Sequence, residues 1–99
     1  MTESHVQDIR QMGISHADFY RHLEQALGGN PYERYGNKVH VSLPAGTVKI
    51  TLGAEKARKL SANVILPYAD VTFDYYGVPD EVRATFERHF HKRFMRGLG

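Results

Sequence analysis

Histidine is the side chain in this sequence that most readily suggests metal chemistry, because the 99 residues include six of them. Two histidines on a helix share a face, and can bind one metal ion, when they are three or four residues apart. His89 and His91 are two apart, and His16 and His22 are six apart, so neither pair has that spacing. Thiolate ligands are excluded because the chain has no cysteine. We therefore predict no metal site and no cofactor.

Catalysis by acids, bases or nucleophiles would require groups that converge in one pocket. Asp70 and Asp74 are four residues apart, which in a strand puts them on one face but separates them by about 13 Å at ~3.3 Å per residue. They are interpreted as ordinary edge charges. No serine lies in a nucleophile-elbow motif, and no glycine-rich phosphate loop precedes a helix. An enzyme is therefore only the third hypothesis, and no catalytic residue is identified.

A positively charged ridge is predicted along the end of the chain. Between positions 88 and 96 there are four cations and no acid. Arg88, Lys92 and Arg96 each follow a phenylalanine by two positions, so on a helix they lie about 200° from the phenylalanine stripe. Such a ridge could bind an anion or a nucleic acid. It could equally offset the helix dipole near the helix C-terminus.

A ring-rich segment between two glycine-containing stretches offers a second possible binding surface. It spans Pro31–Tyr35, and we expect it to be a loop. Tyr32, Arg34 and Tyr35 would form its contact surface, because ordered loops often carry function. The alternative is that these tyrosines fold back over the rim of the core.

A third surface depends on the predicted strands. Apolar and polar residues alternate in them, so one sheet face would pack against helices while the other stays open to water. His40, Lys49 and Tyr76 would point to solvent on that open face, together with Thr72 and Asp74. We expect this face to be the surface on which a partner could bind without disturbing the fold.

Three helices are expected to cover the sheet. The first spans roughly Glu3–Met12, with Val6, Ile9 and Met12 along one side. The second, His16–Leu27, begins with a capping box and ends at a glycine. The last begins at an aspartate after a proline and carries apolar residues spaced by four, which are Val82, Phe86, Phe90 and Phe94.

The strands follow a period of two. The best-specified pair flanks Pro44–Gly46, where proline presets the first turn position and glycine takes a left-handed conformation, as in a three-residue hairpin. Apolar and polar residues alternate in its two expected strands, which span residues 38–43 and 47–52. A further strand is expected from Leu60 to Leu66, broken by Pro67, and another over residues 71–76.

These elements predict an α+β fold of two layers in the order α-α-β-β-β-β-α. An antiparallel meander of three or four strands would have its helices packed on one face. We expect a single domain over residues 1–99, with residues 1–14 as a candidate mobile N-terminal segment.

Composition limits the setting in which the protein works. It is ordinary for a globular domain, with 41% hydrophobic and 24% charged residues. No apolar run approaches the ~20 residues of a membrane-spanning helix, and no secretory signal is visible. With no cysteine in the chain, these features favour a cytoplasmic protein with no membrane partner.

The first functional hypothesis is a small non-enzymatic interaction module. It would bind an unidentified protein partner, or a second copy of itself, through the open sheet face, a sheet edge or the tyrosine-rich loop. The alternative is anion or nucleic-acid binding through the basic last helix. The location of charge is the feature that separates the two, and in the sequence alone it does not decide between them.

Overall fold

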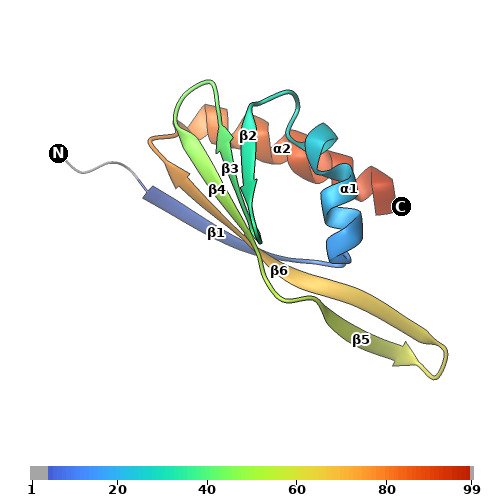
Figure 1. The fold of residues 1–99 in the computed structure, drawn as a ribbon. Helices are drawn as coiled ribbons and strands as arrows, with labels where there is room; N and C mark the ends of the chain where they lie inside the picture. The colour runs from blue at the N-terminus through green and yellow to red at the C-terminus, as the bar shows by residue number, and fades with distance from the viewer. Residues whose placement is uncertain (1–4, 99) are drawn as a thin grey trace.

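The computed structural model describes residues 5–98, with side chains up to residue 94. This part of the chain forms six strands and two helices: β1 (His5–Met12), α1 (His16–Ala26), β2 (Tyr32–Tyr35), β3 (Lys38–Ser42), β4 (Thr47–Leu52), β5 (Lys56–Ser61), β6 (Val64–Tyr76) and α2 (Asp80–Leu98). The antiparallel sheet has the order β1-β6-β4-β3-β2, and β5 pairs with the first part of β6 (Figure 1). The α+β class is as predicted. The expected meander of three or four strands is wrong, because β6 lies between β1 and β4.

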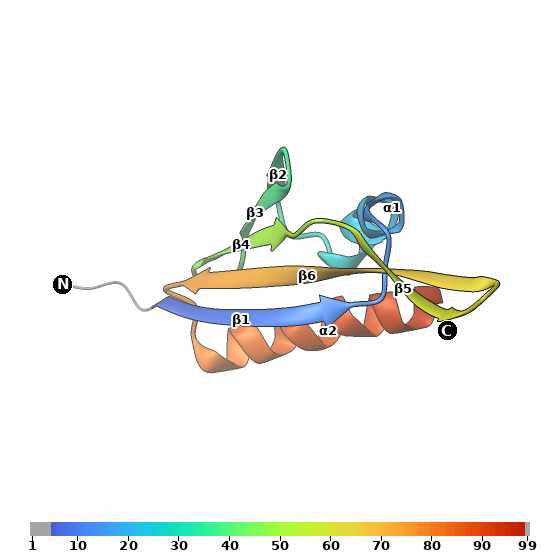
Figure 2. The same cartoon turned by 90° about the horizontal axis from the view of Figure 1, so that it is seen from below.

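The core lies between the helices and one face of the sheet. α2 runs along β1 and β6 (Figure 2), and the Phe90 ring meets the edge of Phe73 from β6 at 5.2 Å between centroids. Phe19 of α1 stacks on Phe94 of α2 at 5.4 Å, so the two helices share one cluster. β3 and β4 contribute alternating buried residues to it, which are Val39, Val41, Val48, Ile50 and Leu52. No helix of the described chain is long and apolar enough to cross a membrane.

The second predicted helix and the central hairpin are confirmed. Ser15 caps α1 by accepting from the backbone N–H of Asp18 at 3.1 Å, and the chain leaves the helix through Gly28 at φ 64°. The β3–β4 turn has Gly46 at φ 81°, and the Leu43 N–H donates to the Gly46 carbonyl at 3.1 Å. Both elements carry strong local signals, which explains why the sequence predicted them correctly.

The prediction of a first helix is wrong, because His5–Met12 forms the edge strand β1. Glu3, where that helix was expected to begin, lies outside the described residues. β1 pairs with β6 from His5 opposite Tyr76 to Met12 opposite Ala69. Residues 5–12 of the candidate mobile N-terminal segment belong to this pairing. The apolar residues at spacing three fit a helix. In the strand, Val6 and Met12 are partly buried and pack against the core. Ile9 instead faces outward and is 60% exposed.

The ring-rich segment is also a strand and not a loop. β2 pairs with β3, so that Glu33 lies opposite His40 and Tyr35 lies opposite Lys38. All four residues of β2 are exposed. The edge of β3 provides unpaired backbone groups, and pairing with them determines the conformation of this short polar segment.

The predicted strand from Leu60 to Leu66 is in fact a hairpin. β5 ends at Ser61, the chain turns at Ala62 and Asn63, and β6 starts at Val64. Pro67 does not break the strand as expected, because β6 continues through it to Tyr76. Proline is tolerated where no hydrogen bond is required of its missing N–H, as at a sheet edge.

Candidate functional site

One row of polar side chains crosses the face of the sheet away from the helices. Strand register aligns Gln7 of β1, Asp74 of β6, Lys49 of β4, His40 of β3 and Glu33 of β2. Residues directly opposite one another in antiparallel strands share a face, so each of the strands β1, β6, β4, β3 and β2 contributes one side chain to this row. A carboxylate lies near each end, with a lysine and a histidine between them.

Asp74 differs from the expectation for this row, because it is only 6% exposed. Its Oδ1 accepts from the Gln7 side-chain amide at 2.8 Å and lies 3.0 Å from His5 Nε2. The His5 ring stacks on Tyr76 at 4.6 Å between centroids. The side chains that cover this carboxylate come from β1, which the sequence analysis interpreted as a helix. Asp74 is therefore neither an edge charge nor open to solvent.

The pKa of Asp74 reflects two opposing influences. Burial raises the pKa, but hydrogen bonds from Gln7 and His5 and the positive charge of Lys49 lower it by more, so the net shift is downward. The carboxylate is therefore held in its charged form. Both of its hydrogen-bond contacts among the described residues are made by Oδ1 to side chains of β1.

The carboxylate at the other end is also engaged. The Tyr35 hydroxyl donates to Glu33 Oε2, and this hydrogen bond raises the pKa of Tyr35. Tyr35 also contacts the edge of the His40 ring at 5.4 Å between centroids. These contacts hold Glu33, Tyr35 and His40 together on the open face of β2 and β3.

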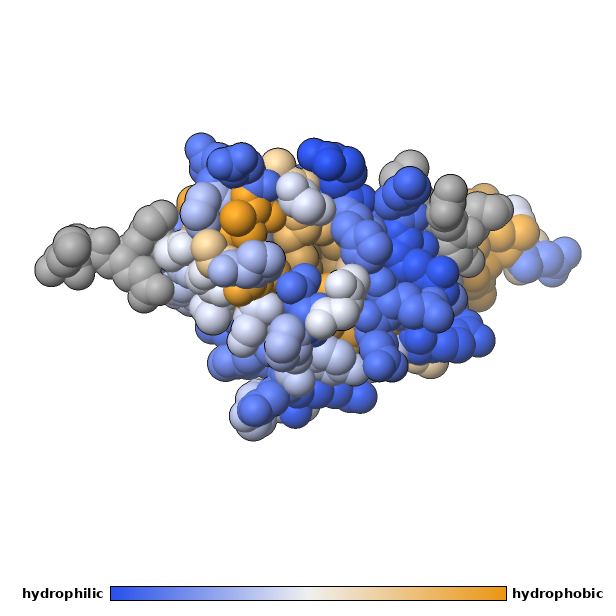
Figure 3. Space-filling model, turned by 90° about the horizontal axis from the view of Figure 1, so that it is seen from above, coloured by the Kyte–Doolittle hydropathy of each residue, from blue (hydrophilic) through white to orange (hydrophobic). Residues whose placement is uncertain are grey.

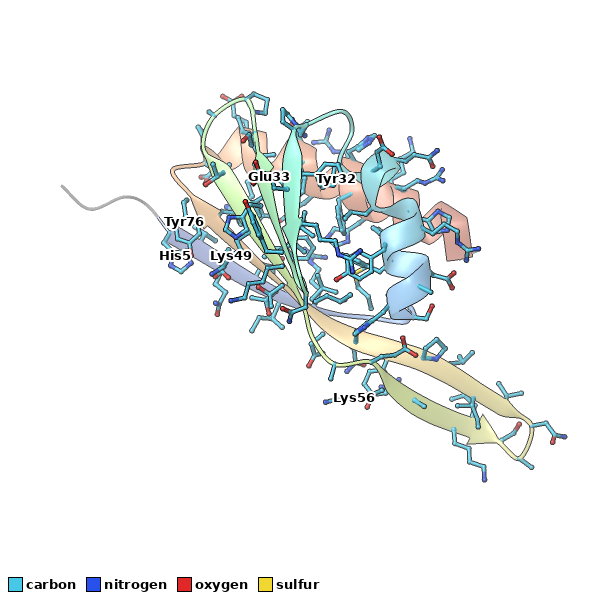
Figure 4. All side chains as sticks on the ribbon, viewed as in Figure 1. His5, Tyr32, Glu33, Lys49, Lys56 and Tyr76 are labelled. Atoms are coloured by element: carbon cyan, nitrogen blue, oxygen red, sulfur yellow. The ribbon has the colours of Figure 1, made fainter. Side chains whose placement is uncertain are left out.

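A groove lies between these two ends. Its volume is about 530 Å³, and it is lined by Pro31, Tyr32, Glu33, His40, Val41, Ser42, Thr47, Val48, Lys49 and Tyr76. Figure 4 shows Lys49 and Tyr76 beside His5 at one end, with Tyr32 and Glu33 on β2. Val41 and Val48 are buried from the other face, so they line the groove through their backbone. Apart from Pro31, the side chains on its surface are polar or aromatic.

The groove offers unused hydrogen-bond donors. Within residues 5–94, no ion pair within 4 Å involves Lys49, and no hydrogen bond involves its side chain. The hydroxyls of Ser42, Thr47 and Tyr76 likewise make no hydrogen bond within this range. A ligand with an acceptor group would therefore find free donors here, whereas Asp74 Oδ1 and Glu33 Oε2 already accept hydrogen bonds from within the protein.

The structure brings some of the expected binding residues together and separates others. His40, Lys49 and Tyr76 line the groove with side chains on the open face. Tyr32 lines it as well, but it lies opposite Val41, so its side chain is on the helix side of β2. Arg34 lies on the opposite side of β2, with its guanidinium 3.5 Å from the centre of the Tyr20 ring of α1. Tyr35 borders the row but does not line the groove.

The cationic ridge is separate from this site. Arg88 and Lys92 are exposed on α2, as expected from their offset from the phenylalanine stripe. The side chain of Arg96 lies outside the described residues. No group of three or more His, Cys, Asp or Glu side chains in the described chain is arranged to hold a metal ion.

Sequence reasoning missed His5, Gln7 and Glu33. The first two were assigned to a helix, and the third to a loop. The alternation of polar and apolar residues from His5 to Gln7 was the one available signal, and it is too short to outweigh the helical spacing around it.

Comparison with protein-family models, curated proteins and solved structures gave no match to this chain. Any function must therefore be argued from the chemistry of the groove and from the surfaces around it.

Proposed function

We propose that this protein is a non-enzymatic binding module that recognises a protein partner through the groove on the open sheet face. The occupant is a short polar segment of the partner that carries one carboxylate. The observation behind this proposal is that Lys49 and three hydroxyls of the groove have free donors, while both carboxylates of the row already accept hydrogen bonds from within the protein. The proposal draws together two of the surfaces expected from the sequence, the open face and the β2 segment.

The charges of the row favour a polypeptide over a nucleic acid. Lys49 provides one positive charge, whereas Asp74 and Glu33 each provide a negative charge within the same row. A polyphosphate would be repelled by these two carboxylates. A single carboxylate can instead approach Lys49 and His40, while neighbouring amide groups meet the hydroxyls of Ser42 and Thr47. Charge-assisted hydrogen bonds of this kind are stronger than neutral ones.

The test is an NMR titration of the whole protein with two blocked short peptides that differ only at the centre, glutamate in one and glutamine in the other. The glutamate peptide should shift amides of β3 and β4 that line the groove. Lys49→Gln should weaken this binding about five- to tenfold, because it removes one charge-assisted hydrogen bond. The matched control is Lys38→Gln, which removes a cation from the same face outside the groove and should leave the affinity unchanged.

Two results would contradict the proposal. Equal shifts with both peptides would show that the carboxylate is not recognised. Shifts confined to α2, lost on changing Arg88 and Lys92 to glutamine, would assign anion binding to the cationic ridge instead.

A further inference from the structure

A second surface lies at the far end of the molecule from the groove. β5 and the first residues of β6, Val64–Tyr68, form a two-stranded hairpin that extends beyond the other strands (Figures 1 and 2); we call this hairpin the arm. Every residue of β5 is exposed, and among the described residues β5 pairs only with β6. Two-stranded ribbons are at best marginally stable in water, and three or more strands are needed for independent stability.

The arm exposes aliphatic side chains that a solvated hairpin does not need. Four of the large hydrophobic residues on the surface belong to it: Leu60 at 59% exposure, Val64 at 43%, Ile65 at 60% and Leu66 at 47%. Figure 3 shows the resulting apolar surface at the arm end of the molecule. Ile65 lies on the other face of the strand from Val64 and Leu66, so the arm exposes apolar side chains on both faces. Exposed apolar surface of this kind marks interaction sites.

The two edges of the arm differ in character. The outer edge belongs to β5 and carries Lys56, Arg58 and Lys59, with no acid among residues 56–68. Lysines on an edge strand discourage pairing with another strand. Two β5 edges would bring these cations together, so this edge is protected against self-association.

The opposite edge carries no cation, and its one residue that discourages pairing is Pro67, which has no N–H to donate and lies after Val64–Leu66. β1 ends at Met12 opposite Ala69, so no strand of the described chain pairs with Val64–Tyr68 on that side. This stretch has no charged residue. The Pro67 carbonyl is turned toward Gly13, on the β1 side. Backbone groups two residues apart in a strand point the same way, so the N–H and C=O of Ile65 also point out of this edge.

We propose that two copies of this chain associate by antiparallel pairing of their Val64–Leu66 edges about a twofold axis at Ile65. Ile65 would then lie opposite its own copy, and Val64 opposite Leu66, so that aliphatic residues meet aliphatic residues. The joined arms form a four-stranded sheet in the order β5-β6-β6-β5, which satisfies the requirement for more than two strands.

Charge favours a second copy over an acidic partner on this edge. In the paired arms the cationic β5 strands lie outermost, three strand spacings or about 14 Å apart. This separation exceeds the ~8 Å screening length at physiological salt, so their mutual repulsion is small. An acidic partner would find no opposite charge on the β6 edge. The shared edge is short, so the dimer should be weak and dependent on concentration. This inference does not rest on the groove, whose residues lie in other parts of the sheet.

The absence of cysteine from the chain permits a direct test. Ile65→Cys places one thiol at the proposed axis, where paired Cα atoms would be about 5.5 Å apart, within disulfide range. The matched control is Lys59→Cys, directly opposite Ile65 in the arm but on the β5 edge. Under mild oxidation Ile65→Cys should form covalent dimers about tenfold faster than the control, because pairing raises the effective thiol concentration.

Sedimentation equilibrium provides the second measurement. Wild type should show a monomer–dimer equilibrium that Ile65→Lys shifts to monomer, with an unchanged thermal midpoint because residue 65 is exposed. The proposal is overturned if both cysteine variants cross-link at the same rate, or if wild type stays monomeric at millimolar concentration. Binding of duplex DNA or anionic lipid vesicles by a monomeric arm, lost on changing Lys56, Arg58 and Lys59 to glutamine, would also overturn it and identify a different occupant.

Discussion

Asp74 shows how one side chain can connect the edge of the sheet to its centre. Gln7 and His5 reach it from β1, and Lys49 lies beside it on β4. A charged group buried at 6% exposure persists only when hydrogen bonds replace the water it has lost. The same bonds anchor the N-terminal strand, so the residue links the stability of β1 to the state of its own carboxyl group.

The lowered pKa of Asp74 makes a specific prediction about pH. A carboxyl whose folded pKa is depressed contributes stability that is fully present above its unfolded value of about 3.9 and is lost as pH falls through the folded value. Asp74→Asn should therefore lower the free energy of unfolding at neutral pH by about 1–3 kcal/mol. It should also flatten the loss of stability below pH ~4, as measured by urea unfolding across pH. Asp70→Asn, an exposed change on the same strand face, should alter neither by more than about 0.5 kcal/mol. Equal effects of the two changes would mean that the Asp74 contacts do not stabilise the fold.

At the scale of elements, the β3–β4 hairpin and α2 were predictable because their signals are local. A proline followed two residues later by glycine defines the turn, and phenylalanines spaced by four define the buried side of the helix. β1 and the β5–β6 hairpin were not predictable in this way. Leu60, Ala62, Val64 and Leu66 keep a period of two straight through the turn, and no glycine or proline marks it. β1 takes its conformation from pairing with β6, which is distant in sequence, and β5 from pairing with the strand that directly follows it.

The candidate site was partly accessible to the same reasoning. Alternation within β3, β4 and β6 places His40, Lys49 and Tyr76 on one face, and each of them lines the groove. The role of Glu33 depends on the register between β2 and β3, which cannot be read from either segment alone. The role of His5 depends on pairing between segments at opposite ends of the chain.

The β3–β4 turn allows a test of how strictly this element depends on glycine. Gly46 and Gly36 both have positive φ, 81° and 59° respectively. A Cβ on Gly46 would lie 2.5 Å from the carbonyl oxygen of Gly77, whereas nothing lies within 4 Å of one on Gly36. Both alanine substitutions carry the backbone penalty of about 1–2 kcal/mol. Gly46→Ala should cost about 1–3 kcal/mol more, because the backbone must also shift. Chemical denaturation measures both, and equal losses would show that the close approach to Gly77 is relaxed at no cost.

At the scale of the whole molecule, the chain is elongated, with extents of 54 × 24 × 23 Å. The length comes from the arm, which carries no residue of the main core cluster. β6 belongs to both regions: its residues 71–76 lie between β1 and β4, while residues 64–68 pair with β5 alone. One part of β6 is therefore paired on both sides, whereas the other part is paired on one side only.

This difference predicts the pattern of hydrogen exchange in dilute solution, where the proposed dimer would be dissociated. Amides in buried, doubly paired strands open only with global unfolding, whereas those in lightly packed ribbons open locally. Amides of Val71–Tyr76 should exchange with the slowest group in the protein, and those of Lys56–Ser61 and Val64–Leu66 should be far less protected. Exchange read residue by residue by NMR measures both halves of β6 in one sample, so each serves as the control for the other. If all of β6 exchanged at one rate, the arm and the body would unfold as a single cooperative unit, and the arm would not be separable from the core. If the halves differ as expected, raising the protein concentration should selectively slow exchange at Ile65, whose N–H points to the edge that a second copy would cover.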